Sequence, residues 1–585
     1  MRGRLGRLAG YAALAAGLFA ATTAQGQVQA AQQAAAPAPG LRHVIVISFD
    51  NTHLSDIEQM PALDGYLKAY GTIFPRDHTA IDAFTHLDFT TELTGLFPSQ
   101  TGILAQSQYI GGHEMSFSYW RDPAGDGTLL HLSPPPWKVF TAHGLAVGAV
   151  GWPDMGMEGY RDVAHYLGTN LPHRASAYYG VAVHWPGGKP PLFGTPNIPF
   201  VYDAKLLNGK GTVGDFPGFG AEVPGWALSA TLAMQTHGVP VTYTYITSVH
   251  DLPGAGQLTA TDPRLKANIA AYNRAFARFF QAMKAHGLTP ANTLLVVTSD
   301  EGDHYLPGGE ISTSLPAWFK RVGFPDTAAT RIGATAGALI YEPGPVAADY
   351  PRLDGVPGWR YIDQGPALKA VHQYVDKDPG RTPTFILYAE PTIWYDNGSS
   401  TALSQGGGYY WNHGMVSSAV NTVFMGLAGP GVRRGGFDHA WIDSTDLMPT
   451  VQYLALGSVQ SGLDGNVLFT ALSRSARSRL AAGVPRLAAL ARAWRKINAP
   501  VGPFGIDALR ISTQAALDMN TPLGPALNGA LARLVAQRNR LAATIASMLW
   551  QGEAGHALAR VTPVIRQATS LLRATEALAT QAMIR

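Results

Sequence analysis

The chain has 585 residues, of which 46% are hydrophobic and 14% are charged, so it exceeds one ordinary domain and can bury a large core. It has no cysteine, which excludes a disulfide framework and a thiolate metal site and leaves His, Asp, Glu and hydroxyl groups as metal ligands. The net charge of +3 is unevenly distributed, because residues 474–585 carry 15 Lys and Arg against 4 Asp and Glu. The remainder is acidic, which suits a cation-binding site.

The N-terminal stretch 1–30 predicts a secretory signal peptide. It has three arginines, then an apolar run and then small residues, and the apolar run is short for a membrane span. An uncleaved N-terminal anchor is the alternative. Residues 31–41 predict a disordered lead into the fold. The expected location is therefore the periplasm or the extracellular space, with no transmembrane span after the signal is removed.

Four apolar segments predict the strands of a central sheet. They are "RHVIVISFD" (42–50), "PVTYTYITSVHD" (240–251), "NTLLVVTSDEGDH" (292–304) and "AVNTVFMGLAGPGV" (419–432). Helices are predicted over 262–287, where Asp262 can cap the N-terminus and Pro263 suits the first turn, and over 444–457. Strand, helix and strand with short connections imply right-handed crossovers. The sequence therefore predicts an α/β fold with a mostly parallel central sheet flanked by helices.

The pattern divides the chain into a body over 42–473 and a C-terminal part. Within the body, 103–235 and 305–410 are rich in Gly, Pro and aromatic residues, lack periodicity and are interpreted as insertions over one end of the sheet. Residues 474–585 are rich in Ala, Leu and Arg and predict a separate α-helical extension. Its basic face is interpreted as solvated surface, so nucleic-acid binding is not expected.

Acidic residues follow three of the predicted strands. Asp50, Asp251 and Asp300 each stand at a strand end, and ligand sites of open α/β sheets form outside the carboxyl ends of the strands. A single such aspartate is usually a turn or a helix cap. Several of them, with Glu301, His304 and His413, favour a bound cation, which offsets the cost of burying clustered carboxylates. The loop at Thr85 then gains a role, because a cation can activate a hydroxyl as a nucleophile.

The ordered set of motifs resembles the alkaline phosphatase superfamily, most closely its type I phosphodiesterase/nucleotide pyrophosphatase branch. The resemblance covers roughly 42–470 and rests on "VIVISFDN", "FTHLDFTTELTGLFPSQTGI", "YITSVHDLPG", "NTLLVVTSDEGDH", "NHG", "AGPGVRRG", "DLMPTVQYLALG" and "LDGNVLF". It implies that Thr85 is the catalytic nucleophile. The metal ligands implied are Asp50, Thr85, Asp251, Asp300, Glu301, His304 and His413.

The chain also departs from the family pattern. Ala255 stands where a second ligand histidine is expected, and Glu301 replaces the histidine of the usual Asp-His pair. Asp88 replaces an asparagine and would repel a phosphate, and Asn51 follows Asp50 where glycine is common. The pairs Asp50-Asn51 and Asp300-Glu301 resemble the phospholipase C/acid phosphatase phosphoesterases, in which one metal can suffice. His304 or His250 could stand in for the missing ligand.

The resemblance implies a secreted or periplasmic hydrolase of phosphate esters that uses one or two divalent ions. Zinc is the expected metal, with manganese or calcium as alternatives, and the expected substrate is a small phosphate ester, a nucleotide or a phospholipid. Sulfate esters are disfavoured, because the sulfatase branch needs a converted Cys or Ser and this chain has Thr85 there. The alternatives are a phosphomonoesterase or phospholipase C-like enzyme, and a non-catalytic relative that binds a glycan, lipid head group or protein.

Overall fold

The computed structural model describes residues 37–583 except 106, 111–112, 117–137, 154–178, 185, 187–222, 253–255, 326–331, 335–336, 342–344, 377–378 and 415. The predicted signal peptide 1–30, most of the lead 31–41, Ala255 and much of the insertion 103–235 lie outside these residues. Within the described part of the chain, none of the helices combines the length and the apolar character that a membrane span requires.

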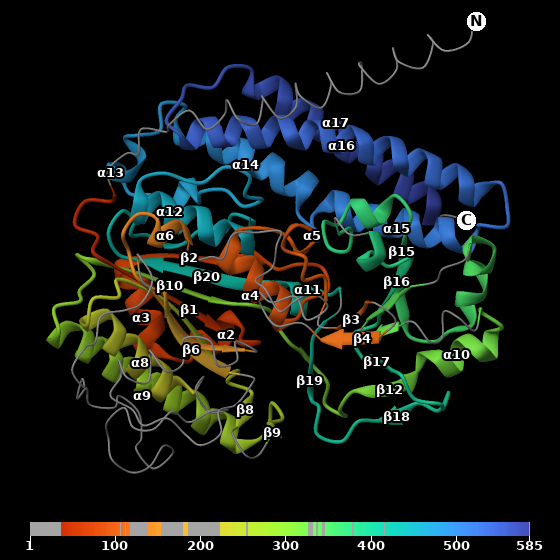
Figure 1. Cartoon of the computed structure of the whole chain (residues 1–585), viewed down its shortest axis with the longest axis horizontal. Coiled ribbons are helices and arrows are strands. Elements are labelled where there is room, and N and C mark those ends of the chain that lie inside the picture. Colours follow the sequence, from red (N-terminus) through yellow and green to blue (C-terminus); the bar gives the residue numbers. More distant parts are fainter. Residues whose placement is uncertain are drawn as a thin grey trace, which may run out of the picture.

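A nine-stranded sheet forms the centre of the molecule (Figure 1). In spatial order its strands are β21 (Gly436–Phe437), β2 (Gly71–His78), β20 (Thr422–Ala428), β10 (Thr293–Ser299), β1 (His43–Phe49), β7 (Val241–Ile246), β5 (Val147–Pro153) and β6 (Tyr179–His184), and β22 (Ile442–Asp443) pairs with β2. Strands β10, β1, β7 and β5 are mutually parallel, whereas β20 and β6 are antiparallel to their neighbours. The predicted mostly parallel sheet is therefore confirmed.

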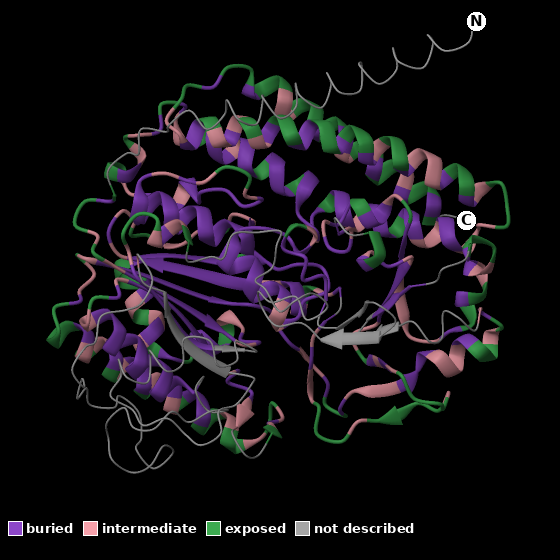
Figure 2. Cartoon of the chain, in the orientation of Figure 1, coloured by how far each residue is buried: buried purple, intermediate pink, exposed green. Residues whose placement is uncertain are grey.

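The central strands are buried on both faces, which explains why they read as continuous apolar runs rather than alternating ones (Figure 2). On one face, Ile45 and Ile47 of β1 pack in a cluster with residues of α3 (Pro61–Tyr70), α8 (Pro224–Thr236) and α9 (Pro263–Ala285). On the other, Val44 and Val46 pack in a cluster with residues of α4 (Thr85–Thr94) and α12 (Leu447–Leu456). Helix α9 begins as predicted, since Asp262 accepts a hydrogen bond from the Arg264 amide.

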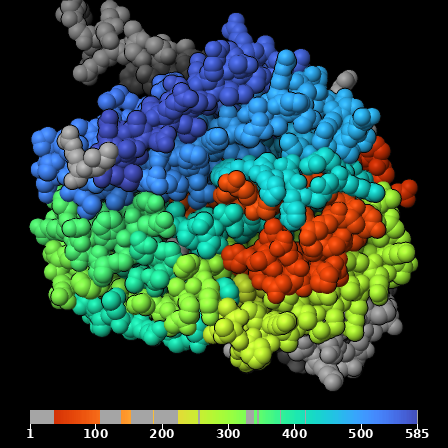
Figure 3. Space-filling model, turned by 180° about the vertical axis from the view of Figure 1, so that it is seen from behind, coloured from red at the N-terminus to blue at the C-terminus, as the bar shows by residue number. Residues whose placement is uncertain are grey.

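The C-terminal part forms a helical layer over the second of these faces (Figure 1). Its helices are α14 (Val484–Asn498), α15 (Pro503–Leu517), α16 (Leu523–Glu553) and α17 (Val561–Met583). Leu487, Ile497, Leu531 and Ile545 belong to the same buried cluster as Val44 of the sheet. Seen from behind, these blue helices extend along one whole side of the molecule (Figure 3).

Buried polar contacts also join this layer to the body. The Arg495 guanidinium donates from Nε to Asp446 Oδ2 over 2.7 Å, and both side chains are almost fully buried. Trp494 Nε1 donates to the Asp464 carbonyl, and Glu553 Oε1 accepts from the Val467 amide, each over 2.9 Å. The composition break predicted independent packing of 474–585, but these contacts indicate that the helices and the sheet share one core.

The insertion 305–410 is folded despite its lack of periodicity. It contains a four-stranded sheet, which we call the insertion sheet, of β13 (Ile332–Ala334), β14 (Gly337–Ile340), β16 (Phe385–Ala389) and β15 (Trp359–Gln364) in that order. Helix α15 adjoins β15, because the backbone amides of Ile362 and Gln364 donate to the hydroxyls of Thr513 and Ser512 over 3.0 Å. The helical layer therefore also supports the insertion sheet.

Candidate active site

Three acidic side chains meet at the carboxyl edge of the central sheet. Asp50 follows β1, and Asp300 and Glu301 follow β10. Strands β1 and β10 pair in parallel with Phe49 opposite Ser299, so Asp50 and Asp300 leave the sheet at the same level. One carboxylate oxygen from each of Asp50, Asp300 and Glu301 lies within 4.8 Å of the others. This spacing allows the three groups to share one cation.

Backbone and side-chain donors fix the Asp300 carboxylate. Its Oδ1 accepts from the amides of Glu301 over 2.8 Å and Asn51 over 3.3 Å, and its Oδ2 accepts from the Tyr245 hydroxyl over 2.8 Å. Asn51 reaches this position in the left-handed region, at φ 43°, which asparagine adopts more readily than most residues. This explains how asparagine can stand where the family pattern has glycine.

Thr85 brings a hydroxyl to the acids. It is the first residue of α4, and its Oγ1 donates to Glu301 Oε1 over 3.0 Å. The first amides of a helix lack intrahelical acceptors and favour an anion nearby. The second Glu301 oxygen, Oε2, is buried without a hydrogen-bond partner, as is Asp50 Oδ1. The arrangement therefore combines a candidate nucleophile, an anion-favouring helix end and unsatisfied carboxylate oxygens.

Burial controls the charge of this acid cluster. It raises the pKa of Asp50 and Glu301 well above the ordinary range, and the neighbouring Asp300 adds to the effect in both. Burial also raises the pKa of Asp300 to about 7. A bound cation would lower the pKa of these three groups and keep the carboxylates ionised. With their orphaned buried oxygens, these residues fit a divalent metal ion.

Asp303 connects two histidines to the cluster. Its Oδ1 lies 3.2 Å from His413 Nδ1 and its Oδ2 lies 3.3 Å from His250 Nδ1, while His413 Nε2 is 3.7 Å from Glu301 Oε1. Burial opposes ionisation of Asp303, but the hydrogen bonds from His250 and His413 outweigh it and lower its pKa. Sequence reasoning missed Asp303, although it stands two residues after Glu301 in "DEGDH".

The structure relates the two remaining predicted ligands, Asp251 and His304, differently to the acid cluster. Asp251, on β8 (Asp251–Leu252), lies at its edge, where burial and then the charge of Asp303 raise its pKa to about 6. His304, on β11 (His304–Tyr305), pairs through its backbone with Asn412, and no hydrogen bond or ion pair of its ring is seen among the described residues. The structure thus groups Asp50, Thr85, Asp300, Glu301 and His413, and His304 as a ligand stays a prediction.

Asp88 is turned into the protein rather than left facing solvent. It is fully buried on α4, and its Oδ1 accepts from the Ala80 amide over 2.7 Å. Burial raises its pKa well above the ordinary range. The carboxyl group thus holds the segment that leads to Thr85, and its burial favours the neutral form, which repels a phosphate less than a carboxylate does.

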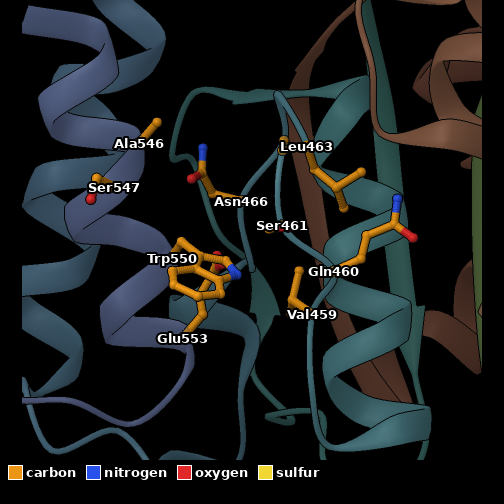
Figure 4. Close-up of a pocket in the computed structure, with 11 residues that line it drawn as sticks. Val459, Gln460, Ser461, Leu463, Asn466, Ala546, Ser547, Trp550 and Glu553 are labelled. Atoms are coloured by element: carbon orange, nitrogen blue, oxygen red, sulfur yellow. The ribbon is translucent and has the colours of Figure 1, made fainter. Parts of the chain in front are cut away.

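Two cavities are candidates for a substrate site, and only one of them has a strand-end acid in its wall. A cleft of about 680 Å³ has Asp251 in its wall, together with Gln257, Arg264, Tyr409 and Tyr410. A pocket of about 240 Å³ lies between the loop 459–466 and α16, and Trp550 and Glu553 line it (Figure 4). None of the strand-end acids lines this second pocket. The cleft at Asp251 is therefore the better candidate for a substrate site.

The mostly parallel α/β sheet with acids gathered at its carboxyl edge is the architecture that the resemblance to the alkaline phosphatase superfamily implied. More narrowly, the chain belongs to the family "Type I phosphodiesterase / nucleotide pyrophosphatase", whose model matches residues 44–416. The family is one of phosphate ester hydrolases, so the resemblance seen in the motifs is confirmed.

Among solved structures, murine ectonucleotide pyrophosphatase / phosphodiesterase 5 is similar at 16% identity and a TM-score of 0.47, over 70% of this chain and 94% of that one. The human protein gives 16% identity and a TM-score of 0.48, over 72% and 97%. An inactive variant of the murine protein in complex with AMP gives 15% and 0.46, over 71% and 94%. No curated protein sequence matches the chain.

Proposed function

We propose that the protein is a secreted or periplasmic, metal-dependent phosphoric ester hydrolase of the phosphodiesterase/nucleotide pyrophosphatase type. The observation that carries the proposal is the hydrogen bond from Thr85 Oγ1 to Glu301 Oε1 within the acid cluster. A threonine hydroxyl is a weak nucleophile by itself, and here it stands where a cation held by the acids would reach it. Family membership supplies the reaction class.

In this proposal Asp50, Asp300 and Glu301 hold the cation together with the Thr85 oxygen. The bound ion supplies Lewis acidity, which lowers the pKa of the hydroxyl and polarises the phosphate ester. Glu301 Oε1, which already accepts the Thr85 hydrogen, takes the proton as Thr85 Oγ1 attacks phosphorus and the bond from phosphorus to the leaving-group oxygen breaks. The amides at the start of α4 orient the phosphate oxygens. A water molecule then attacks phosphorus and breaks its bond to Thr85 Oγ1, which releases the phosphate product and restores the threonine hydroxyl.

Asp251 and His413 are proposed to hold a second ion, and Asp303 orients His413 for it. By accepting from Nδ1, Asp303 fixes the tautomer that leaves His413 Nε2 free as a ligand. With Ala255 in place of another histidine, this site should bind more weakly than the one at Asp300. Zinc suits the mixture of imidazole and carboxylate ligands, with manganese or calcium as alternatives.

The cleft at Asp251 is proposed to accept the leaving group. It offers the aromatic rings of Tyr409 and Tyr410 and the polar side chains of Gln257 and Arg264. Aromatic rings next to a phosphate site suit a nucleotide, because a base can stack on them. Arg264 is paired with Asp262 over 2.6 Å, so a second phosphate would have to compete with that carboxylate for the guanidinium. A phospholipid or another small phosphate ester is the alternative substrate.

Metal removal tests the proposal on the wild-type protein. Hydrolysis of bis-p-nitrophenyl phosphate should stop after dialysis against a chelator and return when zinc or manganese is added, because the nucleophile depends on the cation. An unchanged rate after chelation would contradict a metal-dependent mechanism. If the protein is inert towards diesters, monoesters and sulfates with every metal, the chain is instead a non-catalytic binding relative, as Ala255 and Asp88 suggest.

A further inference from the structure

His250 is a buried histidine whose two ring nitrogens both face carboxylates. It lies in the loop between β7 and β8, directly before Asp251, and 2% of its side chain is exposed. Its Nδ1 is hydrogen-bonded to Asp303 Oδ2 over 3.3 Å, and its Nε2 lies 3.4 Å from Asp56 Oδ2. Both nitrogens are thus occupied, which argues against His250 as the substitute for the missing ligand histidine and gives it another role.

An aromatic stack fixes the plane of the His250 ring. The Trp411 ring lies against it, with 3.8 Å between the centroids and 5° between the planes. Trp411 is itself held, because Gln257 Oε1 accepts from the Trp411 amide over 3.0 Å and Gln257 Nε2 donates to the Trp411 carbonyl over 3.1 Å. A ring that is stacked on a fixed neighbour and occupied at both nitrogens has a single orientation. His250 is therefore a rigid support for the groups that it contacts.

His250 determines how the Asp303 carboxylate is turned. Asp303 divides its two oxygens between two histidines, since Oδ2 faces His250 and Oδ1 lies 3.2 Å from His413 Nδ1. A carboxylate is planar, so holding one oxygen also fixes the direction of the other. The Asp303 backbone is held separately, because its carbonyl oxygen lies 2.9 Å from His53 Nε2. Loss of the His250 ring would therefore release the carboxylate and leave the loop in place.

His413 is the metal-binding group that depends on this carboxylate. With its Nδ1 engaged by Asp303, the ring turns Nε2 towards the acid cluster, 3.7 Å from Glu301 Oε1. A hydrogen bond to the far nitrogen orients a ligand histidine and fixes its tautomer. Because Ala255 stands in place of a second histidine, the proposed second site has one imidazole, and its affinity depends on how that imidazole is held.

We infer that His250 is a positioning residue for the second metal site and acts on His413 through Asp303. The inference rests on the proposed function, because it takes Asp251 and His413 as the ligands of the second ion. His250 touches neither the ion nor the substrate, and Asp56 holds its far nitrogen. The segment that carries Asp251 thus supports a ligand from outside the site, although it lacks the usual ligand histidine.

Zinc titration of the full-length protein tests the inference without requiring turnover. The wild-type protein should bind one zinc ion tightly and a second more weakly, and Asp251→Asn should abolish the weaker binding, which assigns that site. His250→Leu should weaken it by about ten- to a hundredfold, the usual effect of losing a group that orients a ligand histidine. His250→Asn should recover most of the affinity, because its amide nitrogen is as many bonds from the backbone as Nδ1 and can donate to Asp303.

His78→Leu is the matched control. His78 is also buried, its Nδ1 is hydrogen-bonded to the Ile442 carbonyl over 3.0 Å, and its ring is stacked on Trp441 with 4.0 Å between the centroids. Both leucine variants should lower the Tm by several degrees, because each loses a buried hydrogen bond and a ring stack. Only His250→Leu should weaken the second zinc site, so a general loss of stability cannot imitate the expected result.

The outcomes separate this inference from the proposed hydrolase function. Two zinc ions without hydrolysis would contradict the hydrolase and leave the role of His250 intact, whereas hydrolysis with a single zinc ion would overturn that role and leave a one-metal hydrolase. Equal zinc affinity in the wild-type and His250→Leu proteins overturns the inference, and so does an equal loss in His78→Leu. If His250→Leu does not fold, His250→Gln decides, because its amide nitrogen lies one bond further out than Nδ1. It should bind the second zinc more weakly than His250→Asn, and equal affinities would overturn the role of His250.

Discussion

Replacing Thr85 with alanine is expected to lower the turnover of a phosphodiester by on the order of a thousandfold or more while the protein keeps its metal. The substitution removes the attacking oxygen, but Asp50, Asp300 and Glu301 remain to hold the ion. Thr85→Ser should retain measurable activity, because serine keeps a hydroxyl at the same atom position. Initial rates with bis-p-nitrophenyl phosphate and zinc content by elemental analysis measure the two effects separately.

Thr91→Ala is the matched control for this variant. Thr91 lies on the same helix, is fully buried, and donates its hydroxyl to the Leu87 carbonyl. Removing the Thr91 hydroxyl should change the rate only slightly, because this hydroxyl is hydrogen-bonded within α4 and is not one of the groups at the acid cluster. The nucleophile assignment is wrong if Thr85→Ala hydrolyses the substrate as fast as the wild-type protein.

Removing residues 474–585 is expected to leave a body that does not melt cooperatively. The deletion removes the helices that cover the apolar cluster containing Val44, so part of this core becomes exposed to water. It also leaves the buried Asp446 carboxylate without its partner Arg495. Breaking a buried ion pair alone costs about 3–5 kcal/mol, which is comparable with the ~5–15 kcal/mol stability of a whole domain. Gel filtration and thermal melts followed by circular dichroism measure the outcome.

A shorter deletion provides the control. Ending the chain at residue 555 removes α17 but retains Arg495, Trp494 and Glu553 with their contacts to the body. This protein should melt cooperatively at a lower temperature than the full chain. If the deletion at 474 instead gives a soluble body with a cooperative melt near that of the wild-type protein, the helices form an independent unit, as the composition break suggests.

Much of the central sheet and of the acid cluster could be predicted because both depend on local sequence. A strand buried on both faces requires a continuous apolar run, so the segments around β1, β7 and β10 were recognisable. Parallel strands also share one carboxyl edge, so the sequence alone predicts that Asp50 and Asp300 lie together. Helix α9 was recognisable from Asp262 and Pro263 at its start.

The contacts that were missed connect residues that no local pattern relates. Asp303 resembles an ordinary loop acid until the fold brings His250 and His413 to its two oxygens. The docking of α14 depends on the pair of Arg495 with Asp446, while composition reports only that a segment is helical and basic. In both cases a tertiary contact assigns the role.

Zinc content tests most directly whether the strand-end acids hold a metal. The wild-type protein, purified without chelator and desalted, should contain between one and two zinc ions per chain. Asp300→Asn should lose the ion shared by Asp50, Asp300 and Glu301, because one carboxylate ligand is gone. Asp262→Asn, which alters the start of α9 and its pair with Arg264 but none of the proposed metal ligands, should keep the wild-type content. Equal zinc content in the wild-type and Asp300→Asn proteins would contradict the proposed metal centre.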